Sequence, residues 1–143
     1  MRPGARIAAA IEVLEAILNR HQPIAVALSD WGKAHRFAGS GDRNAIGGLV
    51  YEALRRRSSI AWSMDADTPR ALAIGAAPVA YRMDPADVAN ACDGSGHSPE
   101  PLTATERAGL DRGLDSAPPH IRADIPEWLW PRFETAFGES AVE

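Results

Sequence analysis

Residues 40–57 contain the sequence feature that most constrains the fold of this 143-residue chain. Apolar side chains recur there every three or four residues, which is the spacing of one buried face of an α-helix. These positions are Ile46, Leu49, Val50, Ala53 and Leu54. Ser40 is expected to cap the first turn, because its hydroxyl can accept a hydrogen bond from a free amide there. The segment therefore predicts a helix with one face in a hydrophobic core.

The same helix is expected to carry positive charge at its end, where Arg55, Arg56 and Arg57 follow one another. Arg55 lies opposite the apolar face and is free to meet a partner. Arg56 lies one turn from Glu52, so these two side chains are expected to form an ion pair. Arg43 lies at the edge of the apolar face, and we expect it to be partly buried and tied to a carboxylate rather than free to contact a ligand.

Helix signals continue along the chain, and no segment shows the sustained alternation of a strand. A first helix is expected over about residues 4–20, with apolar positions Ile7, Ile11, Leu14 and Leu18. A second opens at Pro23, with one face made by Ile24, Ala27, Leu28, Trp31 and His35. Further helices are indicated by Ile60 with Trp62, by Thr68-Pro69, by Asp84-Pro85 and by the capping box of Thr103 with Glu106. The sequence therefore predicts an all-α fold, a bundle of about seven helices plus a short helical C-terminal extension.

Prolines and glycines mark the positions at which helices are expected to end. Pro78 should kink or end the helix that begins near Pro69, in which Leu72, Ala76 and Val79 should face inward. Residues 93–101 are too rich in Gly and Pro for regular structure. Ala117-Pro118-Pro119 marks the expected domain edge, and the apolar residues beyond it need a surface to cover them: Ile121, Ile125, Trp128, Leu129 and Phe133.

Four segments, by their order and spacing along the chain, resemble the Sun/Fmu family of bacterial ribosomal RNA cytosine-C5 methyltransferases. The Asp42-Arg43 pair, followed by Leu49-Val50-Tyr51 and Leu54-Arg55, is similar to the signature helix of the NusB-like domain at the N-terminus of those proteins. The other segments are Arg2-Pro3-Gly4-Ala5-Arg6, Ala71-Leu72-Ala73-Ile74-Gly75 and Ile125-Pro126-Glu127-Trp128-Leu129. Together they cover most of residues 1–137. The chain departs from the family pattern at Glu52, where glycine is usual, and at Pro78, which interrupts a helix that is normally continuous.

The resemblance implies that residues 1–118 form a NusB-like RNA-binding helical domain. Residues 119–143 would be a linker and the start of the junction to a methyltransferase domain absent from this chain. The implied function is that of an N-terminal RNA-binding accessory domain of an S-adenosylmethionine-dependent 16S ribosomal RNA (cytosine-C5) methyltransferase, which orients ribosomal RNA for the catalytic domain. The absent domain would hold the S-adenosylmethionine and two catalytic cysteines, so no cofactor and no catalytic residue are expected here. The parent protein, rather than this segment, would be the enzyme.

Two other interpretations are open. One is a free-standing NusB-type transcription antitermination factor that binds RNA, and the other is a helical module that only braces its neighbour. The apolar C-terminal segment favours a domain joined to another over a free-standing bundle. It also allows a weak homodimer through the C-terminal extension.

The distribution of charge bears on RNA binding more than the net charge of −4 does. Residues 1–70 have an excess of three positive charges, and residues 71–143 have an excess of seven negative charges. Such asymmetry is expected when one surface meets phosphate, although charged solvated helices are an alternative explanation. Fourteen of the 15 basic residues are arginine, whose planar guanidinium suits phosphate and unpaired bases. We predict RNA contacts from Arg2, Arg6, Arg55, Arg56 and Arg57.

The sequence does not indicate a disulfide, a reactive cysteine or a metal site. Cys92 is the only cysteine, which excludes an internal disulfide, and the negative Asp93 beside it favours an inert thiol. No metal is expected, because the histidines are scattered without a second ligand at zinc spacing: His21, His35, His97 and His120. The longest apolar stretch, residues 71–81, is far shorter than the roughly 20 residues that span a bilayer. No membrane partner and a cytoplasmic location are therefore expected.

Overall fold

The structure, a computed structural model, describes residues 1–112 and 118–122, and over these residues it is all-helical with no strand. The helices are α1 (Pro3–Asn19), α2 (Ile24–Ala34), α3 (Ser40–Arg55), α4 (Arg57–Met64), α5 (Pro69–Ala80), α6 (Pro85–Ala91), α7 (Ala104–Asp111) and the short α8 (Pro119–Arg122). The predicted all-α bundle of about seven helices is confirmed.

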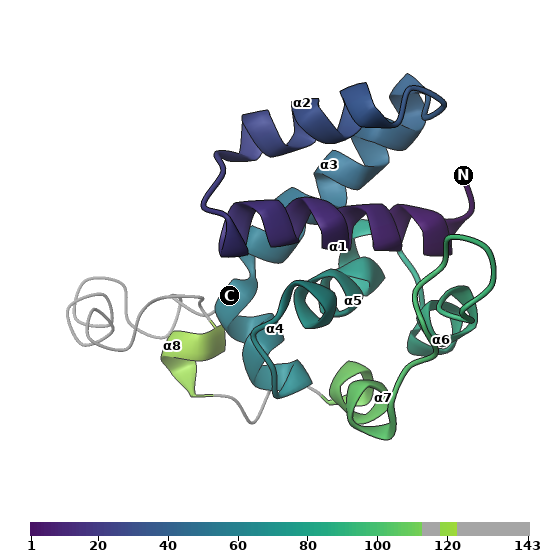
Figure 1. Ribbon diagram of the computed structural model, residues 1–143. Coiled ribbons are helices and arrows are strands. Elements are labelled where there is room, and N and C mark those ends of the chain that lie inside the picture. The colour runs from purple at the N-terminus through teal and green to yellow at the C-terminus, as the bar shows by residue number, and fades with distance from the viewer. Residues whose placement is uncertain (113–117, 123–143) are drawn as a thin grey trace.

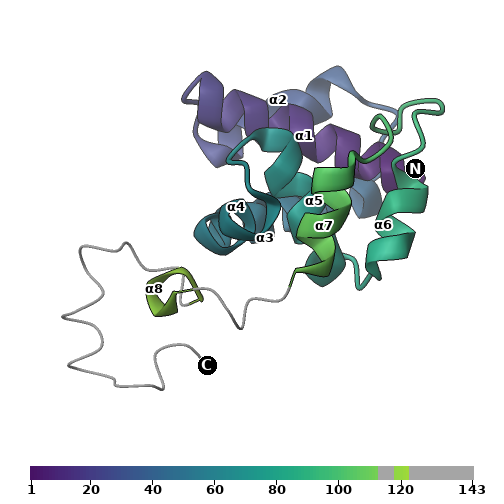
Figure 2. The same cartoon turned by 90° about the horizontal axis from the view of Figure 1, so that it is seen from below.

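Helix α5 lies at the centre of the bundle. It contacts α1, α3 and α4 along its length, and α6 and α7 pack beside it. Figure 1 shows α1 crossing above α5, with α2 antiparallel to α1 at the top of the molecule, and Figure 2 shows α5 surrounded by its neighbours. A helix enclosed in this way must be apolar on nearly every side, and six of its residues are buried: Ala71, Leu72, Ala73, Ile74, Ala76 and Ala77.

Side-chain caps start several of these helices as predicted. The Thr68 hydroxyl accepts a hydrogen bond from the Ala71 amide at 3.1 Å, and Pro69 follows it in the first turn. Thr103 and Glu106 form the predicted capping box at the start of α7. Helix α6 begins at Pro85, and Asp84 caps it.

The predicted N-cap of α3 is wrong by one residue. Gly39 takes that position with extended backbone angles, φ −74° and ψ 175°, and Ser40 is already helical. A side-chain cap requires the non-helical backbone of the N-cap residue, and here Gly39 supplies that conformation without a capping side chain. The apolar face of the helix is as predicted, because Ile46, Leu49, Val50 and Ala53 are buried.

The end of α5 also differs from expectation. The helix continues two residues past Pro78, to Ala80, and Val79 is 53% exposed rather than inward. The 3.6-residue period assigns Val79 to the inner face, but it cannot say where the neighbouring helices stop covering that face. Leu72 and Ala76 are buried as predicted.

The structure describes only a small part of the predicted C-terminal extension. Helix α8 packs against α4, where the Ser59 hydroxyl donates a hydrogen bond to the Ile121 carbonyl at 2.8 Å. Residues 123–143, with the expected apolar contacts of Ile125, Trp128, Leu129 and Phe133, lie outside the described residues. Within the described part of the chain, no helix combines the length and the apolar character that a membrane crossing needs.

Candidate nucleic-acid interface

Arg6, one of the predicted RNA contacts, is bound to Asp42 in the structure. Its Nε and Nη2 atoms donate to the Asp42 Oδ1 atom at 2.9 and 2.7 Å, and the N-terminal amine lies 3.3 Å from the same oxygen. The hydrogen bond from Arg6 is the main reason that the pKa of Asp42 lies below its ordinary value. Arg6 therefore joins the start of α1 to the start of α3. Arg2 is exposed and has no ion pair with a carboxylate of the described residues.

The other three predicted residues lie where α3 ends and α4 begins. The Arg55 side chain is 66% exposed and makes a single 3.4 Å contact with Glu52. Arg56 donates from Nε to the same Glu52 oxygen, which confirms the predicted pair. Arg57 donates to both carboxylate oxygens of Asp67 at 2.9 and 3.0 Å. These three guanidiniums are thus balanced by two carboxylates.

The five predicted residues do not form one site. Figures 1 and 2 both place the N-terminus of α1 on one side of the molecule and the α3–α4 junction on the other. Arg2 and Arg6 belong to the first location, and the arginine triplet belongs to the second. The structure therefore divides the prediction into two separate groups.

The prediction for Arg43 is wrong. Its side chain is exposed, and it has no ion pair with a carboxylate among the residues that the structure describes. The absence of a side chain at Gly32 on α2 leaves room for its stem, since a Cβ built there would lie 3.4 Å from Arg43 Cδ. Arg43 therefore crosses toward α2 and keeps its guanidinium at the surface.

Arg43 lines a groove between α2 and α3 that has a volume of about 790 Å³. We call it the α2–α3 groove, and its polar lining includes Lys33, Arg36, Arg43, Asn44 and Tyr51. None of the residues that line it is acidic. Sequence reasoning missed this cluster, because Lys33 and Arg36 stand apart from the arginine triplet and meet Arg43 only across the groove between α2 and α3.

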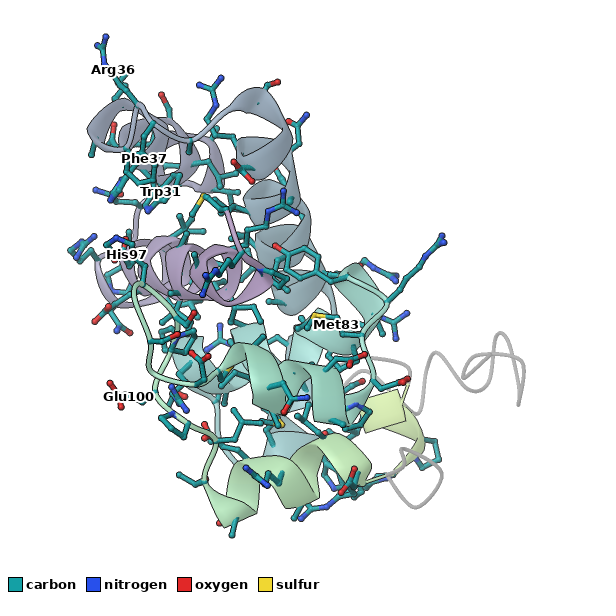
Figure 3. All side chains as sticks on the ribbon, turned by 90° about the vertical axis from the view of Figure 1, so that its right-hand side faces the viewer. Trp31, Arg36, Phe37, Met83, His97 and Glu100 are labelled. Atoms are coloured by element: carbon teal, nitrogen blue, oxygen red, sulfur yellow. The ribbon has the colours of Figure 1, made fainter. Side chains whose placement is uncertain are left out.

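Aromatic residues lie close to the groove, on and after α2. Trp31 is buried, and its Nε1 donates to a Glu12 carboxylate oxygen at 2.9 Å. The His35 ring stacks on Trp31 at 4.2 Å, and its Nδ1 lies 2.8 Å from the Trp31 carbonyl oxygen. Phe37 is 72% exposed, which the sequence did not predict. Figure 3 shows Trp31, Phe37 and His97 on the same side of the molecule, with Arg36 projecting outward.

Cys92 is not equipped for nucleophilic chemistry. It is buried at the end of α6, and this burial raises the pKa of its thiol to about 11. The thiolate, which is the reactive form, is therefore scarce at neutral pH. Among the described residues no group of three or more His, Cys, Asp or Glu side chains is arranged to hold a metal ion.

No protein-family model, no curated protein and no solved structure matches this chain. The resemblance to the Sun/Fmu family therefore stays a prediction.

Proposed function

We propose that this helical bundle is an RNA-binding accessory domain of the Sun/Fmu methyltransferase type. In this proposal the domain is cytoplasmic and holds ribosomal RNA for a catalytic domain on the same parent chain. That absent domain would supply the S-adenosylmethionine chemistry, and this chain would supply affinity and orientation. The inert environment of Cys92 supports such a division of labour, because the only thiol here is buried and has a raised pKa.

The observation that carries the proposal is the arginine triplet at the α3–α4 junction. Arg55, Arg56 and Arg57 lie together at the surface, and Glu52 and Asp67 leave them one positive charge in excess. Surface ion pairs contribute only about 0–1 kcal/mol to stability, so phosphate oxygens can replace carboxylates at little cost. A guanidinium also binds phosphate through two parallel hydrogen bonds. The triplet is therefore suited to the backbone of an RNA strand.

The experiment is an RNA-binding titration of the whole chain at several salt concentrations. Replacing the triplet by alanine, as Arg55→Ala/Arg56→Ala/Arg57→Ala, should weaken binding most at low salt. It should also flatten the salt dependence by about 0.7 log–log unit for each phosphate of a single strand that the variant no longer neutralises. Arg107→Ala and Arg20→Ala are suitable controls, because both arginines are exposed and neither has an ion-pair partner among the described residues.

Unchanged affinity and slope in the triple variant would favour the bracing interpretation instead. In that case the arginines serve only the fold, Arg56 through Glu52 within α3 and Arg57 through Asp67 in the loop between α4 and α5. A thermal melt of each variant separates loss of binding from loss of folding.

A further inference from the structure

The α2–α3 groove gathers three cations that no carboxylate of the described residues neutralises. Lys33, Arg36 and Arg43 are exposed, and none has an ion pair in the part of the chain that the structure describes. The acids nearest to them in sequence face elsewhere. Asp30 lines a different pocket, between α1 and α2, and Asp42 is held by Arg6. A bound polyanion would therefore meet positive charge without a competing carboxylate in the groove.

Part of the groove wall on α3 is backbone without side chains, at Gly47 and Gly48. Gly47 and Gly48 lie in the interior of this 16-residue helix, where glycine is less favourable than alanine. Packing inside the protein does not require glycine at either position. A Cβ atom at Gly48 would meet nothing within 4 Å, and a Cβ atom at Gly47 would make an ordinary 3.9 Å contact with Leu28. Glycine in such a place leaves room for another chain to approach the helix closely.

Tyr51 adds an aromatic surface to the same wall. It follows Gly47 by one helical turn, and its side chain is 55% exposed although it is large and partly apolar. Exposed aromatic rings beside positive charge are the surfaces on which bases of single-stranded nucleic acid stack. The groove volume of about 790 Å³ falls within the roughly 300–1,000 Å³ typical of ligand sites.

We propose that the α2–α3 groove is a second RNA site, in which the cations hold the phosphates of one strand and Tyr51 stacks on a base. This proposal rests on the proposed function for the identity of the ligand, and it adds a site distinct from the arginine triplet. Gly47 and Gly48 let the strand lie against α3, while Lys33 and Arg36 close the groove from the side of α2.

Binding of a fluorescein-labelled single-stranded oligoribonucleotide to the whole chain tests the cations, with fluorescence anisotropy as the readout over a salt series. Arg36→Ala/Arg43→Ala should weaken binding about 20-fold near 0.1 M salt, since two phosphate contacts on a single strand contribute about 1.4 units of slope. The matched control is Arg20→Ala/Arg107→Ala, which removes the same charge from outside the groove and should change affinity less than about twofold.

Two substitutions test the shape of the groove independently of charge. Gly48→Gln fills the groove with a neutral side chain and should weaken binding about tenfold without lowering the melting temperature, because glutamine is the better helix former. Gly41→Gln is its control, since Gly41 also has open space around it and lies in α3 outside the groove. Tyr51→Ala should weaken binding at least about fivefold with an unchanged salt slope, and Tyr51→Phe should retain the affinity.

The outcomes separate the two proposals. If the whole chain binds no RNA at any salt concentration, both proposals fall. If Arg36 and Arg43 instead mediate binding to vesicles of anionic phospholipid and their replacement leaves RNA binding unchanged, only the second site is overturned. If RNA binding depends on Arg55, Arg56 and Arg57 but the groove variants behave as their controls do, only the second site is overturned. An equal loss of RNA affinity in Arg36→Ala/Arg43→Ala and in its control pair would also overturn the second site, because the overall positive charge of the protein surface would then explain the binding.

Discussion

Gly48 and Gly75 are both interior helical glycines, yet the structure surrounds them differently. A Cβ at Gly75 would overlap the Ile60 side chain and lie 3.1 Å from Met64 Cγ, because α4 packs closely on α5. At Gly48 the same atom would enter open space. One glycine therefore permits helix packing, whereas the other exposes backbone in the α2–α3 groove.

The same substitution should consequently have opposite effects at these two positions. Gly48→Ala should raise the free energy of unfolding by about 0.5–1 kcal/mol, since alanine loses less conformational entropy in a helix. Gly75→Ala should lower it by about 1–3 kcal/mol, because the added methyl group must displace packed side chains. Urea unfolding followed by circular dichroism measures both changes. A stabilising Gly75→Ala would mean that α4 moves away from α5 more easily than the packing indicates.

At the scale of the elements, hydrogen bonds between side chains of different helices hold the helix ends in place. Arg70, on α5, donates to both carboxylate oxygens of Glu106 on α7, at 2.8 and 3.0 Å, and to the carbonyls of Glu100 and Pro101. Burial by itself would raise the pKa of Glu106, but the hydrogen bonds from Arg70 and Thr103 outweigh it, so that this pKa lies below 4.5. Glu106 thus caps α7 and ties that helix to the central α5.

Removing this cross-link should destabilise the protein in a pH-dependent way. Arg70→Met keeps the apolar stem and should cost about 1–3 kcal/mol at neutral pH, since it leaves a partly buried carboxylate without its main donor. A carboxyl group with a lowered folded-state pKa stabilises the fold above its unfolded pKa and loses that effect as pH falls. The difference between wild type and variant should therefore shrink as pH drops through 4.5 and below.

Chemical denaturation at a series of pH values measures this difference. Arg107→Met is the matched control, because Arg107 lies beside Glu106 on α7, is exposed and has no ion-pair partner among the described residues. A difference that stays constant from pH 7 to about pH 3 would show that Arg70 acts through packing alone.

On the scale of the whole molecule, α1, α3 and α4 close around α5, and α8 adds an outer contact to α4. Among the described residues, the buried apolar side chains form one core between Ile7 and Leu102. Helix α8 packs on α4, and the Ser59 hydroxyl donates a hydrogen bond to the Ile121 carbonyl, so both contacts link this core to the described residues after Pro118. If the domain boundary lies near residue 118, residues 1–118 should be stable without the segment that follows.

A chain that ends at Pro118 should still fold cooperatively. It loses the 2.8 Å hydrogen bond between Ser59 and Ile121, so we expect a loss of about 1 kcal/mol and a melting temperature lower by roughly 3–4 °C. Thermal melts of residues 1–118 and of the full chain test this, and Ser59→Ala in both lengths shows how much of the difference passes through that bond. Unfolding of the shortened chain at room temperature would place the C-terminal segment in the core and move the boundary.

The candidate interface was only partly predictable from the sequence. Exposure of Arg55 and the Glu52–Arg56 pair followed from helical periodicity, because both depend on positions within one helix. The Arg6–Asp42 bond, the Arg57–Asp67 bond and the exposure of Arg43 did not follow, since each depends on residues of another helix or loop. Side chains that meet over long sequence separations leave no spacing signal.

The sequence by itself determined that this protein is all-α, and it determined most helix starts and the buried face of α3, because caps, prolines and a 3.6-residue apolar period act locally. Only the tertiary structure decided which helix is central, and which glycines pack against a neighbouring helix or face solvent. It also decided which basic side chains form ion pairs with carboxylates. It alone placed Lys33 and Arg36 of one segment beside Arg43 of another. The physical reason is that packing and electrostatics depend on distance in space, while a linear pattern records distance along the chain.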